Sequence, residues 1–401
     1  MKKGQLRKGP LIILMVNMFI GMIGIGLVIP VLPAFLESFG ASGQTLGLLV
    51  ATFSLTQFLF SPMAGELSDK YGRRKFILLG MGCFALSELL FAVSQSLWLL
   101  YVSRLLGGVS AAFLVPAVMA YVADITSEEM RAKGLGLLGA AMSLGFVIGP
   151  GLGGFLAEYG VRIPFYFASG VAVAALILSF FLLPETLSKK AQLKARRALK
   201  KGESFFRQLL RSTRAPYAIL LLLVLAMSFG LANYESIFGL FVDQRFGFTP
   251  KDIAIVITSA AILGVLIQAV VVNKLVALFG ESKVVNGSLA FTAISYLFIL
   301  FARGFWSVLV VTLLTFLATS ILRPAINTLL SKMAGDEQGY VAGMNNAYMS
   351  IGNVLGPAVA GFLYDVNMSW PFLVGSAVFA LCFGVSVLWT RQQAVRQQEM
   401  T

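Results

Sequence analysis

A short polar gap between two long apolar stretches reads Gly65-Glu66-Leu67-Ser68-Asp69-Lys70-Tyr71-Gly72-Arg73-Arg74-Lys75. It holds acidic residues, two glycines and three consecutive cations, which one soluble core would not bury. Cations clustered between membrane-length apolar stretches are typical of a cytoplasmic loop. The chain is therefore predicted to cross a membrane, with this loop on the cytoplasmic side.

The composition of the chain agrees with this prediction. Of its 401 residues, 58% are hydrophobic and 12% are charged, and the mean hydropathy is +0.86. In ordinary soluble domains roughly a quarter of all residues are charged, so this chain has too few charged residues to cover a water-facing surface. The net charge of +13 lies in loops between apolar runs, which favours contact with lipid headgroups over nucleic acid.

Metal and disulfide chemistry find little support in the sequence. The chain has no His, and its two cysteines, Cys83 and Cys382, lie inside apolar runs. We therefore expect no metal site, no disulfide framework and no bound cofactor.

Membrane spans need about 20 largely apolar residues each. Twelve candidates are predicted, at 11–36, 44–67, 76–94, 97–123, 134–159, 163–183, 216–242, 251–273, 283–302, 305–330, 340–365 and 369–390. The first of them shows no small-residue cleavage pattern, so it is predicted to be a retained span and not a signal peptide. An even number of spans places both termini on one side.

The distribution of the basic residues indicates which side of the membrane the termini occupy. With both termini in the cytoplasm, the inner segments hold 25 of the 31 Lys and Arg. The outer segments hold four cations, and two further arginines lie within spans. The positive-inside rule therefore predicts cytoplasmic termini.

The sequence contains an internal repeat and a polar linker that separates two halves. Gly145-Phe-Val-Ile-Gly149-Pro150 returns as Gly352-Asn-Val-Leu-Gly356-Pro357, an offset of 207 residues that neighbouring matches share. Residues 184–215 hold ten Lys or Arg against two Glu and are predicted to form a basic cytoplasmic linker, part of which is also compatible with an amphipathic helix on anionic lipid. We therefore predict an all-α membrane protein of two pseudo-symmetric six-helix bundles, at 1–183 and 216–401, with a substrate path between them.

Several motifs resemble those of the major facilitator superfamily over nearly the whole chain. The 65–75 run is similar to its loop motif, Arg104-Leu-Leu-Gly-Gly108 to its fourth-span motif, and Gly145-x-x-x-Gly149-Pro150 to the fifth-span motif of proton-driven exporters. The segments 24–33, 227–235 and 323–325 resemble the Bmr/NorA-type multidrug efflux transporters. In those relatives a second carboxylate precedes the Arg-Pro pair by three residues, whereas this chain has Ser320, so a two-carboxylate scheme does not carry over intact.

Ionisable residues inside spans cost about 2.5–3.5 kcal/mol on insertion scales and therefore need a reason. Glu235 is the strongest candidate, because a desolvated acid beside aromatic residues can hold either a proton or a cationic substrate. The resemblance implies that Arg104 tunes proton binding, and Arg323 is a further candidate for proton coupling. A purely structural role is the alternative for all three. Glu88 is expected to be structural or close to lipid.

Conformational gating is assigned to two further sets of residues. In the cytoplasmic loop, the resemblance implies that Asp69, Gly72 and Arg73 act together with Asp124, which pairs with Arg73 and helps to bridge the two halves. The alternative is a charged turn that only sets topology. The second set lies in the repeated segments, where resemblance implies that span five is held against a helix of the C-terminal half, and generic helix packing is the alternative. Its members are Gly145, Gly149, Pro150, Gly356 and Pro357.

The substrate cavity is predicted from aromatic, polar and Met side chains. By resemblance, it is lined by Phe53, Gln57, Met142, Phe146, Tyr234, Glu235 and Asn353. An acid surrounded by such residues suits lipophilic cations and planar amphiphiles. We therefore expect a monomeric drug:proton antiporter of the bacterial cytoplasmic membrane that exports small amphiphilic drugs or dyes, is driven by the proton gradient and contacts lipid but no nucleic acid.

Two other functions compete with this prediction. A transporter dedicated to one metabolite or antibiotic class would present several convergent polar residues, and the spans hold few. An intramembrane enzyme or sensor is disfavoured, because the sequence shows no His, no Walker-type loop and no nucleophile beside a base.

Overall fold

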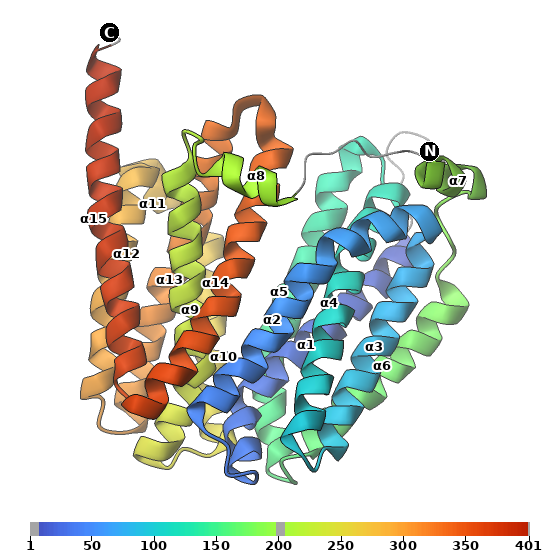
Figure 1. The fold of residues 1–401 in the computed structure, drawn as a ribbon, viewed down its shortest axis with the longest axis horizontal. Coiled ribbons are helices and arrows are strands. Elements are labelled where there is room, and N and C mark those ends of the chain that lie inside the picture. Colours follow the sequence, from blue (N-terminus) through green and yellow to red (C-terminus); the bar gives the residue numbers. More distant parts are fainter. Residues whose placement is uncertain (1–7, 198–204, 400–401) are drawn as a thin grey trace. The chain divides into compact units, whose positions relative to one another are not determined.

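The computed structural model of the protein describes residues 8–197 and 205–399, and all regular secondary structure within these two ranges is helical. This is expected for a chain in lipid, where a helix satisfies the backbone polar groups that water cannot reach. The predicted all-α fold is confirmed (Figure 1).

Twelve long helices coincide with the twelve predicted spans. The first six are α1 (Lys8–Glu37), α2 (Gly43–Tyr71), α3 (Arg73–Val93), α4 (Leu97–Ile125), α5 (Glu128–Ala157) and α6 (Ile163–Leu182). The second six are α9 (Ala218–Phe246), α10 (Pro250–Val270), α12 (Glu281–Phe298), α13 (Phe305–Ala334), α14 (Gln338–Val366) and α15 (Trp370–Glu399). Eleven of them are long and apolar enough to cross a membrane, and α14 is as long but carries three asparagines that lower its hydropathy.

Five short helices complete the described structure. The linker predicted at 184–215 holds α7 (Lys189–Arg197) and α8 (Phe205–Ser212), and its residues 198–204 lie outside the described ranges. The predicted span 251–273 is interrupted after α10, and the chain continues as α11 (Val272–Phe279). Two single 3-10 turns, η1 (Ile299–Phe301) and η2 (Gly335–Glu337), follow α12 and α13.

The helices gather into two compact units. Unit 1 holds α1, α2 from Thr52 onward, α3 to α7, and Thr249–Ile255 at the start of α10. Unit 2 holds Ser42–Ala51 at the start of α2, then α8, α9, the rest of α10 and α11 to α15. The two exchanged segments begin 207 residues apart (249 − 42), which is the offset of the sequence repeat.

Matching glycine contacts build both units. In unit 1, a Cβ added to Gly145 or Gly149 of α5 would lie 2.4 Å or 2.7 Å from a backbone oxygen of α1. In unit 2, a Cβ on Gly352 or Gly356 of α14 would lie 2.5 Å from a backbone oxygen of α9. Close approach of small residues is a main source of helix association in lipid. The repeat read from the sequence is therefore a repeat of helix packing.

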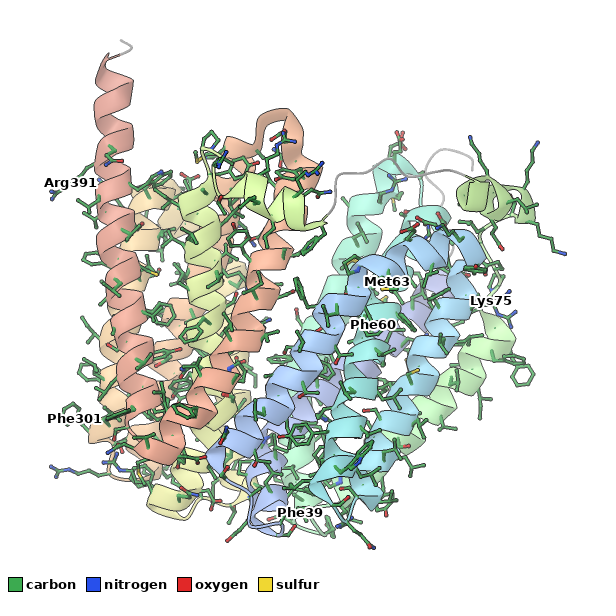
Figure 2. The ribbon with its side chains drawn as sticks, viewed as in Figure 1. Phe39, Phe60, Met63, Lys75, Phe301 and Arg391 are labelled. Carbon is green, nitrogen blue, oxygen red and sulfur yellow. The ribbon has the colours of Figure 1, made fainter. Side chains whose placement is uncertain are left out.

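Several polar contacts between helices are hydroxyl groups that donate to backbone oxygens. Ser169 of α6 donates to the Ala85 oxygen in unit 1, and Ser376 of α15 donates to the Ala293 oxygen in unit 2. Charged side chains gather at the helix ends instead. Figure 2 shows Lys75 and Phe39 at opposite ends of unit 1, and Arg391 and Phe301 at opposite ends of unit 2.

Candidate functional site

Glu235 lies on α9, and it is the one charged residue between Ala218 and Val242. Its side chain is half-buried in unit 2, and Arg323 of α13 exerts an electrostatic attraction on it. Arg323 itself is exposed and donates to the sulfur of Met349 at 3.4 Å. Among the described residues, Glu235 therefore has a charged neighbour but no ion pair within contact distance.

The two residues before Glu235 lie in the interior of unit 2. Tyr234 is 1% exposed, stacks on Phe238 with 5.3 Å between ring centroids and lies 3.2 Å from the Thr312 hydroxyl. Asn233 is fully buried, and neither its side-chain oxygen nor its nitrogen has a hydrogen-bond partner within the described structure. Tyr234 is thus enclosed by protein, and its predicted contact with substrate remains a prediction.

Arg104, the second predicted coupling residue, lies on α4 and is 7% exposed. Its Nη2 is 3.5 Å from Oε1 of Glu88 on α3, and its guanidinium lies 4.4 Å from the centroid of the Phe91 ring. Glu88 is 3% exposed, so it faces Arg104 inside unit 1 and not lipid. The structure thus gives Arg104 an acidic partner that sequence reasoning did not assign to it.

The remaining predicted cavity residues are divided between the units. Phe53, Gln57, Met142 and Phe146 belong to unit 1, and all four are partly buried. Asn353 is partly buried in unit 2, together with Glu235. Phe53 lines a small cavity beside Glu88 and Arg104, and Met142 packs against the apolar core of unit 1. One cavity shared by all seven residues remains a prediction.

The loop residues form a compact charged cluster. Arg73 lies 2.5 Å from Asp69 and 3.4 Å from Asp124, which is the pairing that the resemblance implied. Thr186 donates to the same Asp124 carboxylate at 2.8 Å. All four residues belong to unit 1, and their predicted bridge to the other half stays a prediction.

Glu185 is a member of this cluster that the sequence analysis missed. Its carboxylate accepts the backbone N–H groups of Arg73 at 3.0 Å and Arg74 at 3.2 Å, and so caps the N-terminus of α3. Gly72, with φ at +106°, turns the chain directly under this carboxylate. An acid at the end of the sixth span, on the same predicted side as three consecutive cations, was the available signal.

The glycine–proline segment of α5 contacts two helices. Gly145 and Gly149 pack against α1 within unit 1, and the contact with a helix of the C-terminal half that the resemblance implied for this segment lies at Gly154. Gly154, at the end of the same segment, packs against Ala254 in the first turn of α10. In unit 2, a Cβ on Gly47 of α2 would lie 2.2 Å from the Pro357 oxygen. The first turns of α2 therefore pack closely against the Gly356-Pro357 segment of α14.

The described residues contain no group of three or more His, Cys, Asp or Glu side chains that could hold a metal ion. Their charged groups occur as pairs and small clusters, in which Lys and Arg accompany the carboxylates.

Comparison with known proteins identifies the family. The model of the Major Facilitator Superfamily matches residues 14–271 and 220–399. The chain is 46% identical over 384 residues to multidrug resistance protein 2 of Bacillus subtilis, covering 95% of both chains. It is 36% identical to the quinolone resistance protein NorA of Staphylococcus aureus, covering 96% of this chain and 98% of that protein.

Solved structures agree on the fold. A bacterial homolog of the human lysosomal transporter Spinster, in an inward-facing and occupied conformation, superimposes with a TM-score of 0.78 over 95% of this chain and 96% of that one, at 14% sequence identity. The helical architecture, the internal repeat and the family match agree, and the chain belongs to the Major Facilitator Superfamily.

Proposed function

We propose that the protein is a proton-coupled multidrug exporter that moves lipophilic, often cationic compounds by alternating access. The similarity to proteins named for multidrug and quinolone resistance supports the substrate class. Glu235 carries the coupling, because it is a lone, half-buried acid in an apolar helix with Arg323 attracting it from a neighbouring helix. An acid in that setting binds a proton or a cation in turn, and exchange requires such alternation.

The surroundings follow from the same proposal. The chain is a multi-pass membrane protein, and we place it in the bacterial cytoplasmic membrane with both termini inside, since 25 of 31 Lys and Arg then lie inside. It works as a monomer, without metal or cofactor, and the proton gradient supplies the energy. No catalytic residue is required.

Transport in proteoliposomes tests the role of Glu235. Wild-type protein should accumulate ethidium against its gradient when an inward proton gradient is imposed, and Glu235→Gln should abolish this accumulation. Glu37→Gln, which neutralises an exposed acid at the end of α1, should behave like wild type. Uphill pumping by Glu235→Gln would remove Glu235 from the mechanism.

A panel of chemically unrelated substrates tests the breadth. Cells that express the protein should be protected against cationic dyes and quinolones together, because a cavity lined by aromatic and Met side chains adapts to different shapes. Protection against a single chemical class would favour a dedicated transporter instead.

A further inference from the structure

The ion pair of Glu88 and Arg104 is enclosed in unit 1, whereas Glu235 lies in unit 2. Both residues are more than nine-tenths buried, at 3% and 7% exposure. The 3.5 Å between Arg104 Nη2 and Glu88 Oε1 is too long for a good hydrogen bond. Within the described structure, Glu88 Oε2 and Arg104 Nε and Nη2 have no hydrogen-bond partner. The pair is therefore buried but incompletely satisfied.

Such a pair is costly to maintain. Two charges withdrawn from water are compensated only by close, well-hydrogen-bonded contact, which is missing here. The Phe91 ring stabilises the guanidinium, with 4.4 Å between cation and centroid, but nothing comparable stabilises the carboxylate. Within the described structure, Glu88 Oε2 thus has no hydrogen-bond partner that a bound proton would disturb.

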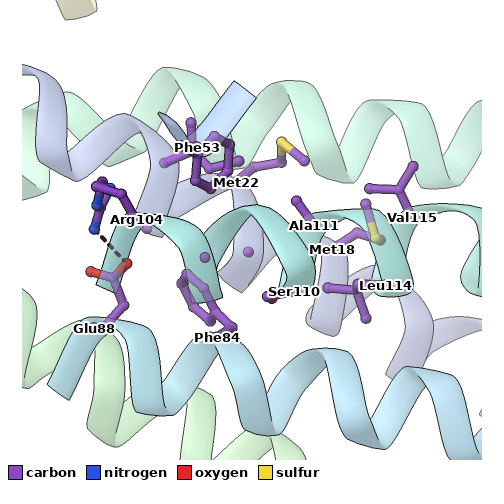
Figure 3. Close-up of a pocket in the computed structure, with 14 residues that line it drawn as sticks. Met18, Met22, Phe53, Phe84, Glu88, Arg104, Ser110, Ala111, Leu114 and Val115 are labelled. Atoms are coloured by element: carbon purple, nitrogen blue, oxygen red, sulfur yellow. Dashed lines mark ion pairs between the residues drawn. The ribbon is translucent and has the colours of Figure 1, made fainter. Parts of the chain in front are cut away.

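A cavity beside the pair provides that room. Met18 and Met22 of α1, Phe53 of α2, and Phe84 and Ser110 line it together with the pair (Figure 3). About 30 Å³ is open to the centre of a water molecule, and one water needs roughly 10–15 Å³ of such space. The cavity can therefore hold water directly beside the ion pair.

No other charge competes for Glu88. α3 packs against α1, α4 and α6, and α1 carries no charged residue between Lys8 and Glu37. α6 carries none, Arg162 directly before it donates to the Ala92 oxygen of α3 at 2.6 Å, and α4 brings Arg104 within reach of Glu88. On α2, the first charged residue is Glu66, more than three turns beyond Phe53. The charge of this site is therefore set by Glu88 and Arg104 alone among the described residues.

We propose that Glu88 is a second proton-binding acid of the transporter, with Arg104 as its positioning residue. When Glu88 is ionised, the pair is neutral, and a lipophilic cation is tolerated beside Phe53. When Glu88 takes up a proton, Arg104 keeps one uncompensated positive charge, which repels that cation. Binding of a cation therefore releases the proton. This inference rests on the proposed exchange of drug for protons.

Proton release on binding tests the proposal directly. Detergent-purified protein in a weakly buffered dye solution is mixed with tetraphenylphosphonium, a permanent cation that carries no proton of its own. Glu88→Gln should release about half as many protons per bound cation as wild type. Glu235→Gln should lose the other half, and the double variant should release almost none. Glu129→Gln, which neutralises an exposed acid of unit 1, should match wild type.

The outcomes separate the two proposals. If Glu88→Gln binds the cation and releases as many protons as wild type, Glu88 is not a proton site. If Glu88→Gln loses half of the release while Glu235→Gln loses none, this inference stands and the proposed role of Glu235 fails. Glu88→Asp, which restores an acid, should recover most of the lost release, whereas a merely structural defect would not be corrected in this way.

A measurement on the unaltered protein covers the case in which Glu88→Gln does not fold. Dicyclohexylcarbodiimide reacts with protonated carboxyl groups in apolar surroundings, and peptide mass spectrometry locates the adduct. Glu88 should be labelled increasingly as the pH falls, and tetraphenylphosphonium should reduce the labelling. Labelling that is absent at every pH, or indifferent to the cation, would overturn the proposal.

Discussion

Charged side chains in this protein occupy two contrasting kinds of surroundings. At the helix ends they form exposed or half-exposed pairs such as Arg211 with Glu337 and Lys251 with Glu158, which contribute little to stability. Inside the spans, Glu88 lies opposite Arg104 at a distance too long for a good hydrogen bond. Glu235 is attracted electrostatically by Arg323 but forms no contact ion pair with it. Within the described structure neither acid has a complete set of partners, and the proton exchange proposed for each would not disrupt a hydrogen-bond network.

The turn at Gly72 gives a prediction about one backbone position. Gly72→Ala should lower the free energy of unfolding by about 1–3 kcal/mol, since alanine is strained at a φ of +106° and its Cβ would lie 2.4 Å from Glu185 Oε2. Thermal unfolding in detergent, followed by tryptophan fluorescence, measures the change. Gly65→Ala, seven residues earlier in the same loop motif, should not destabilise, because nothing lies within 4 Å of its added Cβ. Equal stability of the two variants would contradict the steric argument.

Side-chain partnerships were predictable only where a motif implied them. The pair of Arg73 and Asp124 followed from the resemblance and is confirmed at 3.4 Å. Glu185 was missed because it lies 112 residues from Arg73 in the chain, and the pair of Glu88 and Arg104 because it depends on how α3 and α4 align. A single sequence gives the periodicity of each helix but not the rotation of one helix against its neighbour.

The helix starts show how the repeat is used in packing. The first turn of α2 is held in unit 2, where Asp365 of α14 accepts the N–H groups of Gly43 at 2.7 Å and Gln44 at 3.0 Å. The equivalent acid 207 residues earlier is Glu158, after α5, and it pairs at 2.9 Å with Lys251 in the first turn of α10. Both acids thus lie at the positive end of a helix dipole. Asp365 binds backbone, whereas Glu158 binds a side chain.

This difference predicts unequal effects of removing the two acids. Asp365→Ala should cost the α2 start about 1–2 kcal/mol, as loss of a helix cap does, and so speed amide exchange there roughly 5–30-fold. Hydrogen–deuterium exchange of the peptide that contains Gly43–Leu49 measures the change. Glu158→Ala should leave the exchange of the first turn of α10 nearly unchanged, because it breaks only a surface pair. Similar acceleration in both helices would refute the distinction.

Helix positions were largely predictable, and their ends were less so. Apolar length identified the spans, and each predicted span overlaps a long helix. The span predicted from residue 134 belongs to α5, which begins at Glu128, because a helix can continue past the lipid where water and charged residues support it. The interruption at Val271, between α10 and α11, had no Pro or Gly to indicate it. Hydropathy reports burial in lipid and not the hydrogen bonds that end a helix.

The two halves share a scaffold, but they do not share their buried acids. At the offset of 207 residues, Glu88 corresponds to Ser295 and Glu235 corresponds to Val28. The packing of α5 on α1 and of α14 on α9 is preserved, while the ionisable residues have been placed independently. The symmetric part of the sequence therefore supports the helices, and the asymmetric part sets the chemistry. Two unrelated acids also allow two protons to move in each cycle.

That count predicts how the exporter responds to membrane potential. If two protons enter for each monovalent cation exported, each cycle moves one net positive charge inward, and 100 mV adds about 2.3 kcal/mol of driving force. An inside-negative potential of 100 mV should therefore raise the limiting tetraphenylphosphonium gradient about 50-fold in wild-type proteoliposomes, after the leak in protein-free liposomes is subtracted. Glu88→Gln should exchange one proton for one cation, so a pH difference should still drive it while the potential should not. A Glu88→Gln carrier with the potential dependence of wild type would show that the second charge enters elsewhere.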